Sequence, residues 1–246
     1  AWSPAGTQLL FLRTDETAVP EFDLTYYENR LYPREYRFKY PKAGEQNSTV
    51  SLYVYDTRNG VTRAVGLGET FTETYIPRFG WTTKDDVLWY MLMDRRQQPR
   101  VLSPAGRASP PPPQIGVITK EIYRETSRTY VEVTDDLHFL EDGSGFILTS
   151  EKDGWNHIQW CSMDGKVQRA LTQGEWDVLA VQGVDAARKR VLFTASKRSP
   201  REQEVYAVGL SGKGPVPLSP PGGFNDAEWS EGFRYFINTR STASEP

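Results

Sequence analysis

Serine is the first residue to consider for chemistry, because its hydroxyl becomes a nucleophile when a sharp turn exposes it. The motif for that turn is Gly-x-Ser-x-Gly, since small flanking residues permit the strained step from a strand into a helix. The nearest string is Glu228-Trp229-Ser230-Glu231-Gly232, with glutamate in place of the first glycine and no helical pattern after it. We therefore expect Ser230 to be a turn residue and not a nucleophile.

Histidine and cysteine offer no metal or thiol site. The two histidines, His138 and His157, each lie in an alternating apolar pattern, and Cys161 is the single cysteine. Neither histidine has a partner at His-x-x-x-His spacing, and Cys-x-x-Cys is absent, so the usual zinc patterns are missing. We expect structural histidines and a cysteine in the core, with no metal and no other cofactor.

Adjacent carboxylates occur at Asp15-Glu16 and Asp135-Asp136, where turns meet strands. A solvated face is the ordinary interpretation of such pairs. A glycosidase would require two carboxylates that face each other across a cavity, and the sequence selects no such pair. Asp135-Asp136 stands out only because it ends an irregular connection. The chemistry-bearing residues therefore predict a scaffold and not an active site.

Composition narrows the class of protein further. The chain has 246 residues, of which 38% are hydrophobic and 13% aromatic, enough for a sizeable core. The net charge is -3 and there is no long basic run, so nucleic acid is not an expected partner. No apolar run approaches the length of a transmembrane helix, which takes about 20 residues. We predict a folded domain without a membrane-spanning segment.

The elements that must position these residues are short strands in groups of four, most clearly between Leu137 and Pro220. Each group has apolar runs of period two separated by turn residues, and such a meander cannot bury both faces alone. Phe139, Val184 and Trp229 hold the same place in successive groups and are 45 residues apart. A repeat of about 40–50 residues with four strands is typical of β-propeller blades.

Trp2 and Trp81 mark earlier repeats, which gives about four blades and part of a fifth. The longer gaps between these marks hold a projecting arm and a proline loop at Pro110–Pro113. Between Arg95 and Arg128 the strand pattern weakens. The sequence predicts an all-β fold, a partial β-propeller, and we expect residues 1–246 to be part of a larger ring.

Residues 14–48 break the rhythm of the repeats. Disordered segments contain few aromatic residues, so this stretch is expected to be an ordered arm or hairpin that packs on the propeller or forms an interface. The tyrosines that indicate such an arm are Tyr26, Tyr27, Tyr32, Tyr36 and Tyr40.

Several strings resemble one known family. Trp2-Ser3-Pro4-Ala5-Gly6 and Tyr40-Pro41-Lys42-Ala43-Gly44 are similar to the propeller of the dipeptidyl peptidase IV family. Asp153-Gly154-Trp155-Asn156-His157 and the string from Leu171 to Val178 resemble its bacterial branch, and prolyl tripeptidyl peptidases share them. The resemblance implies an eight-bladed N-terminal propeller followed by an α/β-hydrolase domain with a Ser-Asp-His triad. It implies a serine exopeptidase that removes N-terminal dipeptides ending in proline or alanine.

This resemblance makes residues 1–246 a non-catalytic portion of the propeller, with the nucleophile, the triad and the hydrolase domain outside the chain. The family's pair of glutamates that grips the amino end of the substrate also falls outside, just before the position of Trp2. No residue here is expected to be catalytic. The resemblance further implies a peptide as substrate and a periplasmic or secreted location.

Two segments receive a role from the resemblance. The loop that matches Arg128–Glu132 approaches the substrate cavity, which makes Arg128, Tyr130 and Glu132 substrate-proximal, with simple loop packing as the alternative. The arm that matches Asp23–Gln46 supports a homodimer. The sequence leaves open whether di- or tripeptides are released, and whether the chain is instead a free-standing propeller module for protein binding.

Overall fold

The computed structural model describes residues 1–68, 71–84, 86–106, 114–115 and 121–245, and the predicted proline loop at Pro110–Pro113 lies outside them. Within the described residues the secondary structure is β-strand, apart from one short 3₁₀ turn. The chain divides into two compact units. The first is Ala1–Arg96 with Pro104–Thr119, and the second is Gln97–Ser103 with Lys120–Pro246.

The first unit combines short sheets with one hairpin. Its strands are β1 (Gln8–Asp15), β2 (Glu21–Tyr26), β3 (Arg34–Lys39), β4 (Thr49–Asp56), β5 (Val61–Val65), β6 (Thr74–Tyr75), β7 (Phe79–Trp81), β8 (Val87–Asp94) and β10 (Gln114–Ile115). One sheet has the order β1-β4-β5-β10, and β6 and β7 both pair with β8. Leu10, Leu52 and Val54 are buried where β1 and β4 pair.

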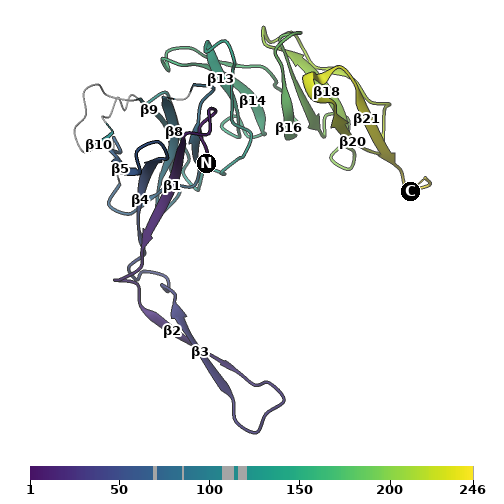
Figure 1. Cartoon of the computed structure of the whole chain (residues 1–246). Helices are drawn as coiled ribbons and strands as arrows, with labels where there is room; N and C mark the ends of the chain where they lie inside the picture. Colours follow the sequence, from purple (N-terminus) through teal and green to yellow (C-terminus); the bar gives the residue numbers. More distant parts are fainter. Residues whose placement is uncertain (69–70, 85, 107–113, 116–120, 246) are drawn as a thin grey trace. The chain divides into compact units, whose positions relative to one another are not determined.

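The hairpin of β2 and β3 extends away from β1 and β4 of the same unit (Figure 1). Its register runs from Glu21 opposite Lys39 to Tyr26 opposite Arg34. Phe22 and Phe38 meet edge to face with ring centroids 6.0 Å apart, and Tyr40 packs against both rings. The tyrosines Tyr26, Tyr27, Tyr32, Tyr36 and Tyr40 all remain exposed. The hairpin therefore keeps its shape through strand pairing and a few aromatic contacts, with little core of its own.

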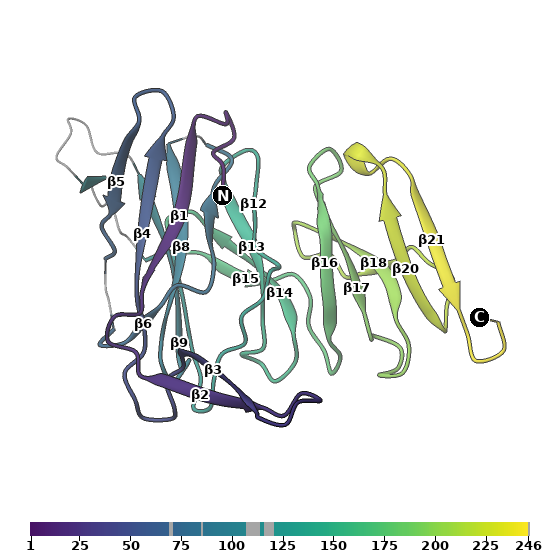
Figure 2. The same ribbon diagram turned by 60° about the horizontal axis from the view of Figure 1, so that its bottom comes forward.

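The second unit contains the repeated sheets. Its strands are β9 (Pro99–Gly106, of which the first residues belong here), β11 (Tyr123–Thr126), β12 (His138–Phe139), β13 (Gly145–Ser150), β14 (His157–Ser162), β15 (Gln168–Ala170), β16 (Val178–Asp185), β17 (Arg190–Ala195), β18 (Glu204–Gly209), β19 (Val216–Pro217), β20 (Phe224–Trp229) and β21 (Phe236–Ser241), with the 3₁₀ turn η1 (Glu231–Phe233). Two successive sheets have the orders β12-β13-β14-β15 and β16-β17-β18-β19, and β20 pairs with β21 (Figure 2). These meanders confirm the all-β fold, a partial β-propeller, and the two four-stranded groups between Leu137 and Pro220.

The stretch between Arg95 and Arg128, where the sequence pattern weakens, contains β9 and β11. These strands pair antiparallel, with Tyr123 opposite Leu102 and Glu125 opposite Arg100. The reason for the weak pattern is that the Arg100 and Glu125 side chains are themselves buried. A pattern based on apolar residues cannot register a strand whose inward positions carry charges.

The core of the second unit lies on the inward faces of β13, β14, β16, β17 and β18. Phe193 is fully buried, and its ring stacks on Trp176 at 6.4 Å and on Tyr206 at 5.7 Å between centroids. Stacked or offset rings at such distances contribute beyond their buried area. The remaining buried members of this cluster are Ile147, Ile158, Leu171, Val178, Val181, Val191, Ala195 and Val208.

In the second unit, hydrogen bonds link the repeat of β12–β15 to the sheet β16–β19, and that sheet to the pair β20–β21. Oδ1 of Asp136 accepts the main-chain N–H of Val181 at 3.0 Å, 45 residues further along the chain. Gln182 makes similar contacts with the repeat that follows it. Its amide donates to Asp226 at 2.9 Å and accepts from the indole of Trp229 at 2.8 Å. Adjacent sheets are thus joined by polar contacts as well as by apolar packing.

Candidate functional site

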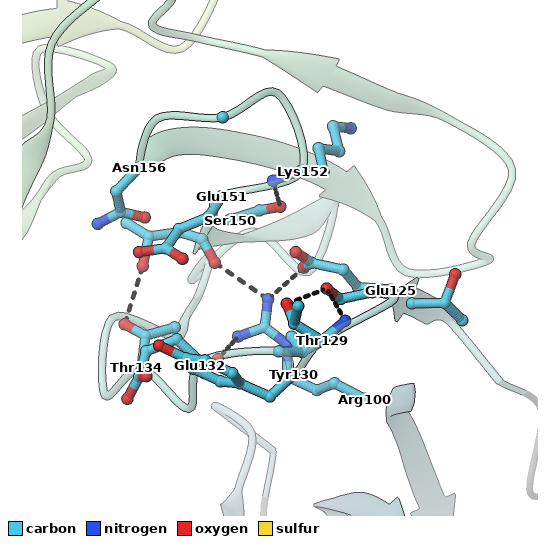
Figure 3. Close-up of a pocket in the computed structure, with 15 residues that line it drawn as sticks. Arg100, Glu125, Thr129, Tyr130, Glu132, Thr134, Ser150, Glu151, Lys152 and Asn156 are labelled. Carbon is cyan, nitrogen blue, oxygen red and sulfur yellow. Dashed lines mark hydrogen bonds and ion pairs between the residues drawn. The ribbon is translucent and has the colours of Figure 1, made fainter. Parts of the chain in front are cut away.

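A cavity of about 350 Å³ opens in the second unit beside the pair β9–β11. One wall is the rim segment, defined here as residues 126–134, which connects β11 toward β12. The opposite wall is the loop from Ser150 to Asn156 between β13 and β14, and Arg100 and Glu125 lie at the base (Figure 3). The cavity is therefore built from three segments that are far apart in the sequence.

Arg100 and Glu125 form a buried ion pair at the base of the cavity. They are directly opposite each other on β9 and β11, so both side chains leave the sheet on the same face. Nη2 of Arg100 lies 2.6 Å from Oε2 of Glu125, and only 2% and 8% of the two side chains are exposed. Charges so deeply buried persist in a fold only when they are paired and hydrogen-bonded.

Tyr123 completes this cluster. It stands two residues before Glu125 on β11, hence on the same face, and its hydroxyl donates to Oε2 of Glu125 at 2.6 Å. The guanidinium of Arg100 lies 5.6 Å from the centre of the Tyr123 ring. Burial, together with the charge and the hydrogen bond of Glu125, raises the pKa of Tyr123 well above its usual value. The phenol therefore stays protonated and keeps donating.

The rim segment is held by its main chain to Gln97 and Gln98, the two residues before β9. The N–H of Ser127 donates to the carbonyl of Gln98 at 3.0 Å, and the N–H of Val131 donates to the carbonyl of Gln97 at 2.8 Å. Nε2 of Gln98 returns a hydrogen bond to the carbonyl of Arg128 at 3.1 Å. Gln97 adopts the left-handed region with φ of 57°, which costs a non-glycine residue about 1–2 kcal/mol. This conformation lets the Gln97 carbonyl accept the hydrogen bond from Val131 on the rim.

The three residues predicted to be substrate-proximal all lie on the rim segment. Tyr130 and Glu132 line the cavity, and the Tyr130 side chain is 58% exposed. Arg128 is exposed on the same segment, and its carbonyl is bound by Gln98. Their substrate-proximal role remains a prediction.

The cluster at the base is what the sequence analysis missed. No local pattern joins Arg100, Tyr123 and Glu125, because their meeting depends on the register of two strands in a stretch with a weak signal. A signal was available in one respect. Arg100 directly precedes the apolar residues Val101 and Leu102, and a charge beside an apolar run can indicate a buried partner.

The lining of the cavity has the chemistry of a binding site for a charged ligand. Its charged lining residues are Arg100, Glu125, Glu132, Glu151 and Lys152, and the described residues around it include no histidine or cysteine. Since Arg100 is already paired with Glu125, Lys152 is the one other cation among the described lining residues to balance the exposed carboxylates of Glu132 and Glu151. Such a lining favours a ligand with a cationic group.

His157 has the structural role predicted for it. Nε2 donates to the carbonyl of Gly174 at 2.9 Å, and Nδ1 lies 3.1 Å from the hydroxyl of Thr172, which also accepts the N–H of Ile158. The ring meets Trp176 edge to face at 4.9 Å. Two of the strings that carry the family resemblance therefore bind each other.

Asp136 lies just before β12 and His138 lies on it, and burial shifts the pKa values of both side chains. Burial lowers the pKa of His138, an effect that the charge of Asp136 partly offsets. Burial also raises the pKa of Asp136, despite the hydrogen bond from Val181. His138 lines a separate, more apolar cavity of about 740 Å³ together with residues such as Val184, Leu210 and Phe233.

The other reactive residue types lie where the sequence placed them. Ser230 immediately precedes η1, in the turn between β20 and β21. Cys161 is buried on β14, and burial raises the pKa of its thiol to about 11, so it is not a nucleophile at neutral pH. Among the residues that the structure describes, no three His, Cys, Asp or Glu side chains gather as a metal site. In the same residues no helix has the length and hydrophobicity to span a membrane.

Comparison with known proteins agrees with this architecture. The family described as "Dipeptidyl peptidase IV (DPP IV) N-terminal region" matches residues 1–246. A probable dipeptidyl-aminopeptidase B of Emericella nidulans is 29% identical over all of this chain, which covers 29% of that protein. A probable dipeptidyl peptidase 4 of Trichophyton verrucosum is 29% identical over 88% of the chain, again 29% of the relative.

Solved structures that resemble this chain include two dipeptidyl peptidases. The crystal structure of Porphyromonas gingivalis dipeptidyl peptidase 4 is similar with a TM-score of 0.85 and 38% identity, over 99% of this chain and 33% of that one. A putative dipeptidyl aminopeptidase IV from Bacteroides ovatus shares the fold, with a TM-score of 0.80 at 24% identity, over 97% of this chain and 35% of that one. The chain thus spans about a third or less of its relatives. On the family match over its full length, the chain belongs to the dipeptidyl peptidase IV N-terminal region family.

Proposed function

We propose that residues 1–246 are the non-catalytic propeller portion of a serine exopeptidase that removes N-terminal dipeptides ending in proline or alanine. The observation that carries the proposal is the family match over the whole chain, supported by 38% identity to a solved dipeptidyl peptidase 4. The nucleophile and its triad are assigned to a hydrolase domain elsewhere in the full-length protein.

The cavity bounded by the rim segment is proposed to control how the peptide substrate reaches that domain. A peptide presents a cationic amino end, and the rim and the facing loop supply Glu132 and Glu151. The exposed ring of Tyr130 offers an apolar surface beside them. Arg128, Tyr130 and Glu132 are therefore proposed as substrate-proximal residues.

The hairpin β2–β3 is proposed to support a homodimer. Leu31, Tyr27 and Tyr32 at its end are 90%, 84% and 78% exposed, and exposed tyrosines of this kind are enriched in interfaces. For an enzyme that acts on external peptides, a periplasmic or secreted location is also proposed. Fractionation of cells that produce the full-length protein tests that location.

The activity is tested on the full-length protein with two chromogenic substrates, Gly-Pro and an amino-terminally free Ala-Ala-Pro. We expect cleavage of Gly-Pro, abolished by an inhibitor that reacts with a catalytic serine. Cleavage of Ala-Ala-Pro alone would assign the protein to tripeptide release. Failure to cleave either substrate would overturn the peptidase proposal.

The exposed aromatic residues of the hairpin favour one alternative, a free-standing propeller module for protein binding. It predicts association through the hairpin without any peptidase activity. The same assay separates the two, because the alternative requires that both substrates remain uncleaved.

A further inference from the structure

Arg100 connects the buried ion pair to the rim of the cavity. We infer that Arg100 is a positioning residue, which fixes the rim segment so that Tyr130 and Glu132 lie at the cavity, and thereby sets how tightly substrate binds. This inference rests on the proposed function in one respect, that the cavity receives the substrate. Its structural part, the control of the rim by Arg100, can be tested separately.

The guanidinium of Arg100 serves three elements at once. Nη2 binds the carboxylate of Glu125 on β11 at 2.6 Å and donates to the carbonyl of Thr149 on β13 at 3.1 Å. Nη1 donates to the carbonyl of Glu132 on the rim at 3.1 Å (Figure 3). A planar fork of donors can reach three acceptors in this way, which the single ammonium of a lysine cannot reproduce.

The hydrogen bond to Glu132 acts at the part of the rim that faces the cavity. The neighbouring Val131 is buried with 5% exposure, and its N–H is bound by Gln97, so this residue anchors the segment. Tyr130 and Glu132 on either side of it line the cavity. Because Tyr130 and Glu132 flank the anchored Val131, both side chains should shift when the Glu132 carbonyl loses its hydrogen bond to Arg100. Loss of Arg100 should therefore displace both cavity-lining residues.

A matched cluster exists on β18, away from the rim. Glu204 is buried, and its carboxylate accepts hydrogen bonds from Arg198 at 2.8 Å, from the hydroxyl of Tyr206 and from the N–H of Gly222 at 2.8 Å. It thus combines Arg, Glu and Tyr as the Arg100 cluster does. None of these hydrogen bonds involves residues 126–134, so Glu204→Gln is a control for a general loss of stability.

The first experiment measures kcat and KM of the full-length protein for Gly-Pro and Lys-Pro chromogenic substrates. Arg100→Met should raise KM for both substrates tenfold or more and leave kcat within threefold. Arg100→Lys restores a positive charge beside Glu125 but not the donor to the Glu132 carbonyl, so KM should stay raised at least fivefold. Glu204→Gln should change KM less than twofold. Recovery of the wild-type KM by Arg100→Lys, or an equal change in KM by Glu204→Gln, would overturn the inference.

The second experiment needs no peptidase activity. Hydrogen exchange of the Val131 amide is followed in the full-length wild type, in Arg100→Lys and in Glu204→Gln. We expect exchange at least tenfold faster in Arg100→Lys and within twofold of wild type in Glu204→Gln. Faster exchange in a protein that cleaves neither substrate would support control of the rim while the proposed function fails. Unchanged exchange in Arg100→Lys would refute the positioning role whatever the activity.

Discussion

The α-carbon of Gly145 on β13 lies against the carbonyl of Cys161 on β14, so that an added Cβ would stand 2.2 Å from the carbonyl oxygen and 2.9 Å from the Trp160 ring. Because the nearest obstacle is backbone, a side chain here must separate two paired strands. We expect Gly145→Ala to destabilise the protein by about 1–3 kcal/mol, the usual cost of overpacking. Urea unfolding measures the change.

Gly209→Ala is the matched control for that substitution. Gly209 ends β18, and a Cβ there would meet Ser211 Oγ at 3.5 Å, an ordinary contact. A shift below about 0.5 kcal/mol is expected for such a site. Equal effects of the two substitutions would contradict the close approach of β13 and β14.

Asp56 should make stability depend on acid pH. Hydrogen bonds from the Arg58 side chain, at 2.6 Å and 3.0 Å, lower the pKa of this buried carboxyl to about 2, although burial opposes them. A lowered pKa in the folded state stabilises the protein above the unfolded value of 3.8, and that contribution is lost as the pH falls toward 2. Since Arg58 is half exposed, we expect about 1–2 kcal/mol at pH 7.

Asp56→Asn tests this expectation by urea unfolding at pH 7, 4 and 2.5. The variant should be less stable than wild type at pH 7, and the difference should narrow between pH 4 and pH 2.5. Asp153→Asn, in an exposed loop, serves as the control. A difference that stays constant over this range would show that the charge of Asp56 is not responsible.

Phe193 should be the most sensitive aromatic residue of the core, because its ring is fully buried between Trp176 and Tyr206. Phe193→Ala removes the ring and leaves a cavity, which costs about 3–5 kcal/mol. Val216→Ala, at an exposed position of β19, should cost less than about 0.5 kcal/mol. Thermal unfolding followed by circular dichroism compares the two, and similar midpoints would rule out the stacked core described here.

Substitutions at the end of the hairpin β2–β3 should change the oligomeric state of the protein but not its fold. Tyr27→Ser with Tyr32→Ser removes two exposed rings from its end, so the unfolding midpoint should stay within about 2 °C, whereas dimer should convert to monomer. Light scattering of the full-length protein gives the mass. Tyr55→Ser, on β4 outside the hairpin, should leave the mass unchanged. A double variant that keeps the dimer mass would exclude the hairpin as the interface.

The repeat was predictable from sequence because it depends on alternation within short segments. The spacing of Phe139, Val184 and Trp229 located the sheets that become β12–β15 and β16–β19. The base of the cavity was not predictable, since Arg100 and Glu125 meet through the register of β9 and β11. Charges at inward positions also weakened the apolar pattern that would have revealed those strands. The loop with Tyr130 and Glu132 came from family resemblance and not from any pattern of its own.

The hydrogen bond from Val181 to Asp136 spans one repeat, and Gln182 reaches Asp226 and Trp229 in the following one. At both junctions, polar groups of the earlier repeat thus hydrogen-bond to the repeat that comes after it in the chain. The later repeat can therefore dock on an earlier repeat that has already folded. Links of this kind between consecutive sheets allow assembly to proceed in chain order, which limits the time for which an apolar face stays without a partner.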